Sequence, residues 1–119
     1  MNETHQWIAE ARYKGSGKHP KYPNMGLDRI HMDQGFIFAT DSLIMRFIRG
    51  APEGVSASLT YEEFLTWSLT GVLSNSTPLL IDKYWKEKWL EFFLARPHPG
   101  YKVSIHDSDG IQIKATGDE

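Results

Sequence analysis

The chain has 119 residues, a length that suits one domain over residues 1–119 with its own hydrophobic core. Hydrophobic residues make up 40% of it and charged residues 24%, as in folded globular proteins. The net charge of −2 excludes a broadly basic nucleic-acid binder, and the lack of cysteine excludes a disulfide framework and a cysteine metal site.

The first predicted element is a helix over about Glu3–Tyr13. One face of it carries Trp7, Ile8 and Ala11, at the spacing of a helix that lies on a core. The loop that follows, residues 14–25, is rich in glycine and proline and is long for a compact domain. Loops of this kind are often functional or mobile.

Three strands are predicted next, over about Leu27–Met32, Phe36–Thr40 and Leu43–Ile48. Gly35 lies where the turn between the first two strands needs a positive φ angle. Apolar residues alternate along these strands, which predicts an antiparallel sheet with one buried face. A short strand over about Val55–Leu59 follows.

The next helix has the clearest start signal in the chain. Thr60 and Glu63 have the spacing of a capping box, and Gly71 is a suitable stop. Pro78 suits the first turn of a further helix, which we expect over residues 79–95.

One segment of the sequence occurs twice. Ile30–Asp41 is echoed by Ile105–Thr116, with the Ile-His pair and the turn glycine aligned without a gap. The second copy belongs to a predicted hairpin of strands Tyr101–His106 and Ile111–Ala115, and a helix lies upstream of each copy. The sequence therefore predicts a pseudo-duplicated α+β domain, with antiparallel strands and two or three helices on one side.

A local basic region departs from the overall charge balance. Residues 11–30 hold five basic residues against one acidic residue, a net charge of +4. Basic side chains in a loop can contact phosphates, and Tyr13 and Tyr22 could stack on bases. DNA is therefore a candidate partner, although a solvated loop would have the same composition. The candidate DNA contacts are Arg12, Lys14, Lys18 and Lys21.

The helix expected over residues 79–95 is apolar almost all round. Such a helix is either covered by two layers of the protein or meets another chain with one face. A protein partner, a second copy or a host protein, is therefore expected. The candidate partner contacts are Trp85, Trp89, Leu90, Phe93 and Leu94.

No catalytic set stands out, so neither enzyme activity nor a cofactor is expected. Two histidine–aspartate pairs offer an alternative, His31 with Asp33 and His106 with Asp107. If the repeats packed face to face, these side chains could bind a divalent metal and support a small metal-dependent hydrolase. Histidines at strand ends are more often surface or hydrogen-bonded residues, so we expect no metal site.

The stretch from Gly26 to Ser42 resembles a segment of DNA polymerase sliding-clamp domains, in which a strand, a turn and a second strand end in Ala-Thr-Asp, here residues 39–41. The strands and the capped helix predicted up to Leu69 continue the resemblance. The clamp domain is itself an internal duplication. The chain departs from the family at Ser42 and Leu43, where clamps have Gly and His, and it holds one domain where a ring needs several.

The resemblance implies a non-enzymatic binding protein, in a DNA-replication or viral setting, that forms a ring or binds a host protein. Clamp helices present Lys and Arg to DNA, a role that would fall here to Arg12 and Lys14, with Lys83 and Lys86. An inhibitor that holds a host protein through the 79–95 helix is the alternative. Because the sequence shows no secretory signal and no membrane-spanning apolar run, a cytoplasmic location without membrane contact is expected.

Overall fold

The computed structural model of this protein describes residues 2–74, 77–81, 100–107 and 109–115. The helices within these residues are α1 (Glu3–Ala9) and α2 (Tyr61–Thr70). The strands are β1 (Ile30–Asp33), β2 (Phe36–Thr40), β3 (Ile44–Arg49), β4 (Ala57–Leu59), β5 (Thr77–Pro78), β6 (Tyr101–Ile105) and β7 (Ile111–Ala115). No helix in the described residues combines the length and the apolar character that crossing a membrane requires.

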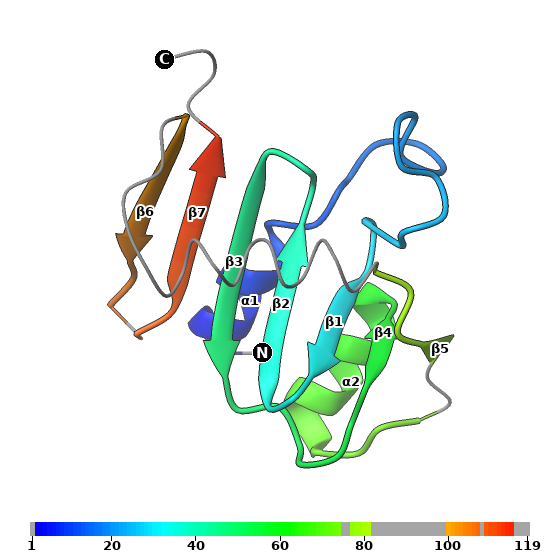
Figure 1. Ribbon diagram of the computed structural model, residues 1–119. Coiled ribbons are helices and arrows are strands. Elements are labelled where there is room, and N and C mark those ends of the chain that lie inside the picture. Colours follow the sequence, from blue (N-terminus) through cyan, green and yellow to red (C-terminus); the bar gives the residue numbers. More distant parts are fainter. Residues whose placement is uncertain (1, 75–76, 82–99, 108, 116–119) are drawn as a thin grey trace.

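The described strands belong to one antiparallel sheet, in the order β5-β4-β1-β2-β3-β7-β6. Figure 1 shows α1 and α2 on the same side of this sheet, and both helices contribute to one core cluster. The architecture is therefore α+β, as the sequence predicted, with an antiparallel sheet and the two described helices on one side.

The face of the sheet that carries the helices holds the first apolar core. Alternate residues of β1, β2 and β4 point to this face and pack against Ile8 of α1 and Phe64 of α2, both fully buried. The strand residues in this core are Ile30, Met32, Ile37, Ala39, Ala57 and Leu59. Burial of each large apolar side chain contributes roughly 1.5–3 kcal/mol, so this contact fixes the helices on the sheet.

The opposite face is buried as well, which corrects the prediction of a single buried face. Phe38, Phe47 and Ile113 are at most 1% exposed there, and Leu27 and Ile81 pack with them. The rings of Phe38 and Phe47 stack with their centroids 5.8 Å apart. The reason lies in β2, whose continuous apolar run is typical of a strand covered on both faces.

Four elements, α1, β1, β4 and β6, are shorter than the sequence predicted, and the first two differences have a local cause. α1 ends at Ala9. The N–H groups of Ala11 and Arg12 donate to carbonyl oxygens three residues back instead of four, and this tightens the last turn. β1 begins at Ile30, because Gly26, with a φ angle of +61°, starts a turn that the amide of Arg29 closes.

The start and the end of α2 follow the prediction. The Thr60 hydroxyl accepts from the Glu63 N–H at 3.1 Å, and the Glu63 carboxylate accepts from the Thr60 N–H at 2.8 Å. Gly71 follows the helix with a φ angle of 75°, and its N–H donates to the Trp67 carbonyl at 2.8 Å. These caps satisfy backbone groups that a helix end otherwise leaves unpaired.

The predicted role of Pro78 is wrong. Thr77 and Pro78 form β5, a two-residue edge strand in which Pro78 lies opposite Ala57 of β4. An edge strand tolerates proline, because the N–H that proline lacks need not donate to a neighbouring strand. The helix expected over residues 79–95 lies outside the described residues from residue 82 onward.

The two hairpins of the sequence repeat lie in one sheet, with β3 between them. Their aligned residues have different surroundings. Ile30 and His31 begin β1 and are fully buried, whereas Ile105 ends β6 and is 74% exposed, and His106 lies in the turn beyond it. The duplication and the clamp-like architecture stay predictions from the sequence.

Candidate anion-binding site

A closed loop connects α1 to β1. The Tyr13 N–H donates to the Leu27 carbonyl oxygen at 2.8 Å and joins the two ends of residues 14–26. Compact loops with joined ends, packed by their own side chains, are often functional. Figure 1 shows this loop standing beyond one end of the sheet, next to β1. We call residues 13–27 the basic loop.

His19 lies at the centre of the basic loop. Its Nδ1 accepts from the backbone N–H groups of Lys21 and Tyr22, at 3.1 and 3.2 Å. Its ring centroid lies 4.8 Å from that of Tyr13 and 5.5 Å from that of Tyr22. Because Nδ1 is an acceptor, the ring proton lies on Nε2, which is 3.4 Å from the Ser42 hydroxyl. His19 therefore fixes the shape of the loop from within.

The two tyrosines of the basic loop have structural roles. Tyr13 and Tyr22 are partly buried and pack on the second core as well as on His19. Rings held in this way are not free to stack on nucleic-acid bases, so the predicted stacking role finds no support. Phosphate contact through the lysines of this loop stays a prediction from the sequence.

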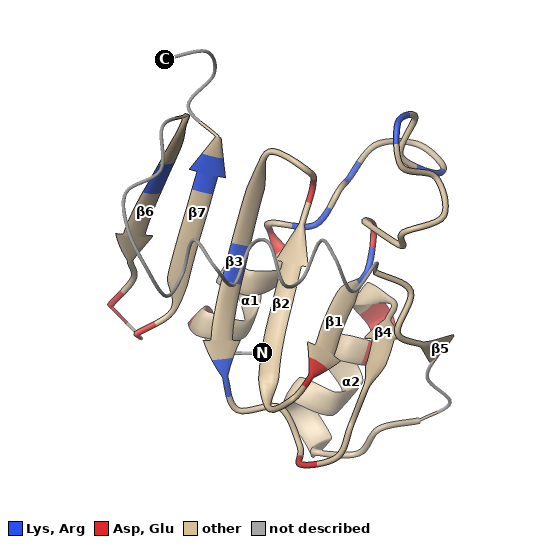
Figure 2. Cartoon of the chain, viewed as in Figure 1, with Lys and Arg blue, Asp and Glu red and all other residues tan. Residues whose placement is uncertain are grey.

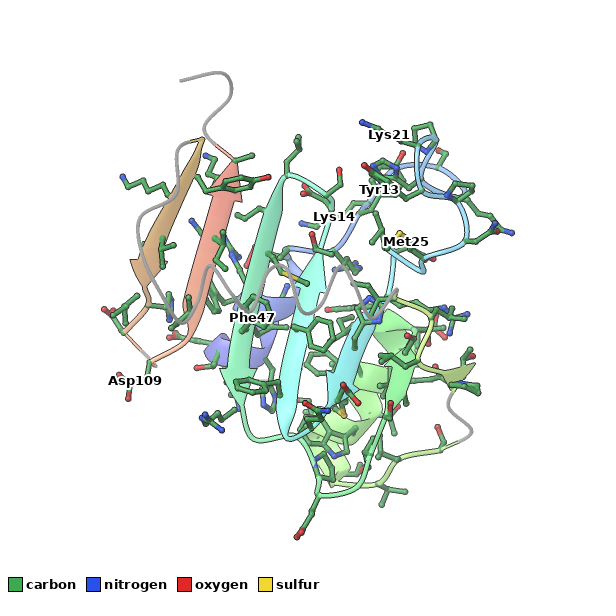
Figure 3. The ribbon with its side chains drawn as sticks, in the orientation of Figure 1. Tyr13, Lys14, Lys21, Met25, Phe47 and Asp109 are labelled. Atoms are coloured by element: carbon green, nitrogen blue, oxygen red, sulfur yellow. The ribbon has the colours of Figure 1, made fainter. Side chains whose placement is uncertain are left out.

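Three of the four predicted DNA contacts lie on the basic loop. Lys14, Lys18 and Lys21 are exposed, and within the described residues none of them forms an ion pair. Figure 3 shows Lys14 and Lys21 on this loop, and Figure 2 shows its basic residues far from the carboxylates of the β6–β7 turn. Uncompensated ammonium groups gathered on one loop attract anions.

Arg12 has a different environment. Its Nη1 donates to the Ala9 carbonyl at 2.7 Å, and its guanidinium carbon lies 4.3 Å from the ring centre of Tyr61. Tyr61 is the first residue of α2, so Arg12 links the end of α1 to the start of α2. A structural role therefore fits Arg12 better than DNA contact.

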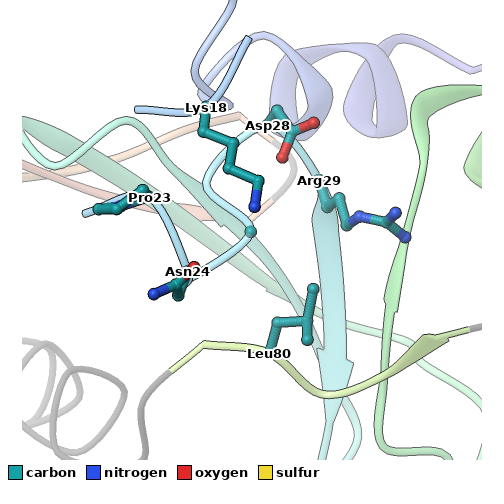
Figure 4. A pocket seen from close by; sticks show the side chains of 7 residues that line it. Lys18, Pro23, Asn24, Asp28, Arg29 and Leu80 are labelled. Atoms are coloured by element: carbon teal, nitrogen blue, oxygen red, sulfur yellow. The ribbon is translucent and has the colours of Figure 1, made fainter. Parts of the chain in front are cut away.

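A pocket of about 430 Å³ opens between the basic loop and residue 80. This volume lies within the range of small-molecule sites, roughly 300–1,000 Å³. Figure 4 shows Lys18 reaching toward the space between Asn24 and Arg29, with Leu80 on the far side. The described residues that line it are Lys18, Pro23, Asn24, Gly26, Asp28, Arg29 and Leu80.

Two hydrogen bonds hold Arg29 at the edge of this pocket. Its Nη1 donates to the Ser58 carbonyl at 3.3 Å and to the Thr77 hydroxyl at 3.1 Å, which also ties β5 to β4. Nε and Nη2 of Arg29 have no partner within the described residues. Since a guanidinium carries five N–H donors, the remaining ones are available to an anion.

A buried polar pair lies beside the pocket. His31 of β1 and Ser58 of β4 are fully buried cross-strand neighbours, with Nδ1 2.7 Å from the hydroxyl oxygen. The Ser58 hydroxyl oxygen also accepts from the Leu80 N–H at 2.9 Å, so this hydroxyl joins His31 to the segment that follows β5. Within the described residues Nε2 of His31 has no partner.

Burial, with a smaller contribution from the charge of Arg29, lowers the pKa of His31 from 6.5 to about 3, so the ring is neutral. A serine–histidine pair of this kind could suggest a nucleophile, but both side chains are fully buried and cannot meet a substrate. The pair instead holds Leu80, one wall of the pocket, against the sheet.

A second serine–histidine pair joins the two helices. Nδ1 of His5 lies 2.6 Å from the Ser68 hydroxyl, and the His5 ring lies beside those of Phe64 and Trp67, with centroids 5.5 and 5.2 Å away. Partial burial, followed by the positive N-terminus, lowers the pKa of His5. This contact is structural and lies on the helix side of the sheet.

The histidine–aspartate pairs that could have bound a metal do not meet. His31 lies on β1 and His106 follows β6, and β2, β3 and β7 separate these strands. His106 stacks on Trp7 instead, with ring centroids 4.4 Å apart. The part of the chain that the structure describes holds no group of three or more metal-binding side chains. The alternative of a metal-dependent hydrolase therefore loses its site.

The predicted partner contacts on the aromatic helix lie outside the described residues. Three residues of the 79–95 segment are described. Ile81 is buried in the second core and Leu79 packs against it, whereas Leu80 is 39% exposed at the pocket. Residues 79–81 therefore pack on the second face of the sheet, beside the basic loop.

The sequence does not assign His19, Asn24 or Arg29 to a site. Arg29 belongs to the basic region, but the sequence places it in a predicted strand. The signal that could have separated it is Gly26, three residues earlier, since a glycine at that distance permits a turn before the strand. His19 and Asn24 carried no local signal.

Comparisons of the chain with protein-family models, with curated proteins and with solved structures found no match. The sliding-clamp resemblance of residues 26–42 therefore has no support beyond the residues themselves.

Proposed function

We propose that this protein is a non-enzymatic binding protein that contacts nucleic acid through the basic loop. The observation that carries the proposal is that Lys14, Lys18 and Lys21 are exposed and form no ion pair, within the described residues, on a loop whose shape His19 fixes. A loop that is already ordered loses less conformational entropy on binding. Its cations are thus preorganised for an anionic partner.

Two arguments favour nucleic acid as the anion. The repeated charges of a phosphate backbone match several lysines placed along one loop. The resemblance of residues 26–42 to sliding-clamp domains points to DNA by analogy. Because Tyr13 and Tyr22 are held inside the loop, we expect contact with the backbone and little readout of sequence. In this proposal the protein acts in the cytoplasm.

The overall charge of −2 limits the affinity of the protein for nucleic acid. The acidic side chains Asp107 and Asp109 lie at the β6–β7 turn, away from the basic loop, so they weaken steering without blocking the contact. We therefore expect modest affinity that falls steeply with salt.

The test compares two variants that each lose two lysines. Lys14→Gln with Lys21→Gln removes charge from the basic loop. Lys102→Gln with Lys114→Gln removes the same charge from the β6–β7 hairpin, where these lysines are cross-strand neighbours. Duplex DNA binding is measured by fluorescence anisotropy at several salt concentrations.

The loop variant should lower the slope of log K against log salt by about 2, since each phosphate contact contributes roughly 0.9. The hairpin variant should leave that slope close to the wild-type value. The proposal would be contradicted if the loop variant kept the wild-type slope, or if both variants lowered the slope by the same amount.

A further inference from the structure

We propose that the pocket between the basic loop and Leu80 holds one nucleoside monophosphate unit, with its phosphate at Lys18. This inference rests on the proposed function, because it names the part of the nucleic acid that the loop region takes up. The unit is either a free mononucleotide or the phosphorylated end of a strand, and both present the same phosphate and sugar chemistry.

The phosphate position follows from Lys18. Its side chain is exposed and reaches into the space between Asn24 and Arg29, whereas the guanidinium of Arg29 points toward β4 (Figure 4). Arg29 is fixed there by its bonds to the Ser58 carbonyl and the Thr77 hydroxyl, and it adds positive charge to the wall of the pocket. An ammonium group forms charge-assisted hydrogen bonds to phosphate oxygens.

The remaining walls fit a nucleoside. Asp28 and Asn24 line the pocket with a carboxylate and an amide, which can pair with sugar hydroxyls. Pro23 and Leu80 supply apolar surface for a base. A carboxylate near the phosphate would repel an isolated anion, so Asp28 favours a phosphate ester that also carries hydroxyl donors over inorganic phosphate.

The pocket depends on a close approach of two chain segments. A Cβ atom placed on Gly26 would lie 3.0 Å from Cδ1 and 3.2 Å from Cβ of Leu80. The Leu80 N–H is held by the Ser58 hydroxyl, so this wall does not retreat easily. The space is thus bounded by the basic loop on one side and by a hydrogen-bonded segment on the other.

The experiment measures the affinity of the intact protein for one short single strand, with and without a 5′-phosphate, by fluorescence anisotropy. The wild type should bind the phosphorylated strand roughly tenfold more tightly, the effect of one charge-assisted contact. Lys18→Gln should bring the ratio of the two affinities close to one. Lys21→Gln, a loop lysine that does not line the pocket, should weaken both strands equally and keep the ratio.

A titration with adenosine monophosphate alone, followed by NMR, distinguishes a free mononucleotide from the end of a strand as the ligand. Shifts at Asn24 and Arg29 amides that disappear in Lys18→Gln identify a free nucleotide as a ligand. Absence of such shifts, with the strand ratio retained, identifies the end of a strand. A ratio of one in the wild type, with no shifts, would overturn the inference.

The failure of this inference and that of the proposed function are distinguishable. Absence of both the phosphate preference and the nucleotide shifts, with the duplex salt slope intact, rejects the pocket and leaves the basic loop as a backbone contact. If duplex DNA binding by the wild type does not depend on salt, the proposed function itself is rejected.

Discussion

The two faces of the sheet differ in what buries them. The helix face is covered by α1 and α2 and is closed by apolar side chains such as Ile37 and Phe64. The opposite face is buried to the same degree but holds the polar pair His31–Ser58 and adjoins the basic loop and its pocket. One set of strands thus serves stability on one side, and on the other it also positions the candidate site.

The largest expected effect tests whether both faces are true cores. Ile37 and Phe38 are neighbours in β2, point to opposite faces and are at most 1% exposed. We expect Phe38→Ala to lower the free energy of unfolding by about 3–5 kcal/mol and Ile37→Ala by about 2–5 kcal/mol, because each leaves a cavity. Urea denaturation measures both.

Lys102→Ala, on the exposed edge strand β6, serves as the control and should change the free energy of unfolding by less than about 0.5 kcal/mol. A cost below about 1 kcal/mol for Phe38→Ala would show that the second face is not a packed core.

The next effect is the pH dependence of stability that comes from His31, on the pocket side of the sheet, and from His5, on the helix side. The folded pKa of His31, about 3, lies below its unfolded value of 6.5, so the unfolded chain takes up a proton first as the pH falls. The stability due to neutral His31 is complete above pH 6.5 and is lost as the pH falls toward 3. At about 1.4 kcal/mol per pKa unit, the total loss is on the order of 5 kcal/mol.

Unfolding measured from pH 7 to pH 3 tests this prediction with two variants. His31→Asn keeps a hydrogen-bonding group for Ser58 but cannot take up the proton, so the pH dependence should largely disappear. His5→Asn should remove a smaller part, because His5 is only partly buried. A wild-type pH dependence in His31→Asn would refute the assignment.

The smallest effect concerns the anchoring of the helix face. Thr60→Ala removes the hydroxyl that accepts from the Glu63 N–H, and we expect a loss of about 1 kcal/mol. Thr66→Ala changes an exposed threonine inside the same helix and should be neutral or slightly stabilising. Thermal unfolding should separate the two variants, and equal melting temperatures would mean that the cap contributes nothing.

Much of the fold could be predicted because its signals are local. The bounds of β2 and the capping box of α2 follow from residues within a few positions of each other. The order of the strands could not be predicted, since the pairing of β3 with β7 joins segments more than sixty residues apart. The burial of both faces also depends on such distant contacts.

Of the candidate site, only the positive charge of the loop could be predicted from the sequence. Lysines in a glycine-rich loop are visible in the sequence, but the internal bonds that fix that loop are not. The pocket needs Leu80 to lie beside Gly26, and Arg29 to be held by Thr77. Neither contact has a local signature, because each depends on how β5 folds back onto β4.

One nitrogen atom governs the conformation of the basic loop. The single lone pair on Nδ1 of His19 serves two peptide groups at once, those of Lys21 and Tyr22. Both peptides would lose this acceptor at the same time if His19 were replaced by a side chain without it. The path of the chain from residue 19 to residue 22 therefore depends on a single side-chain atom.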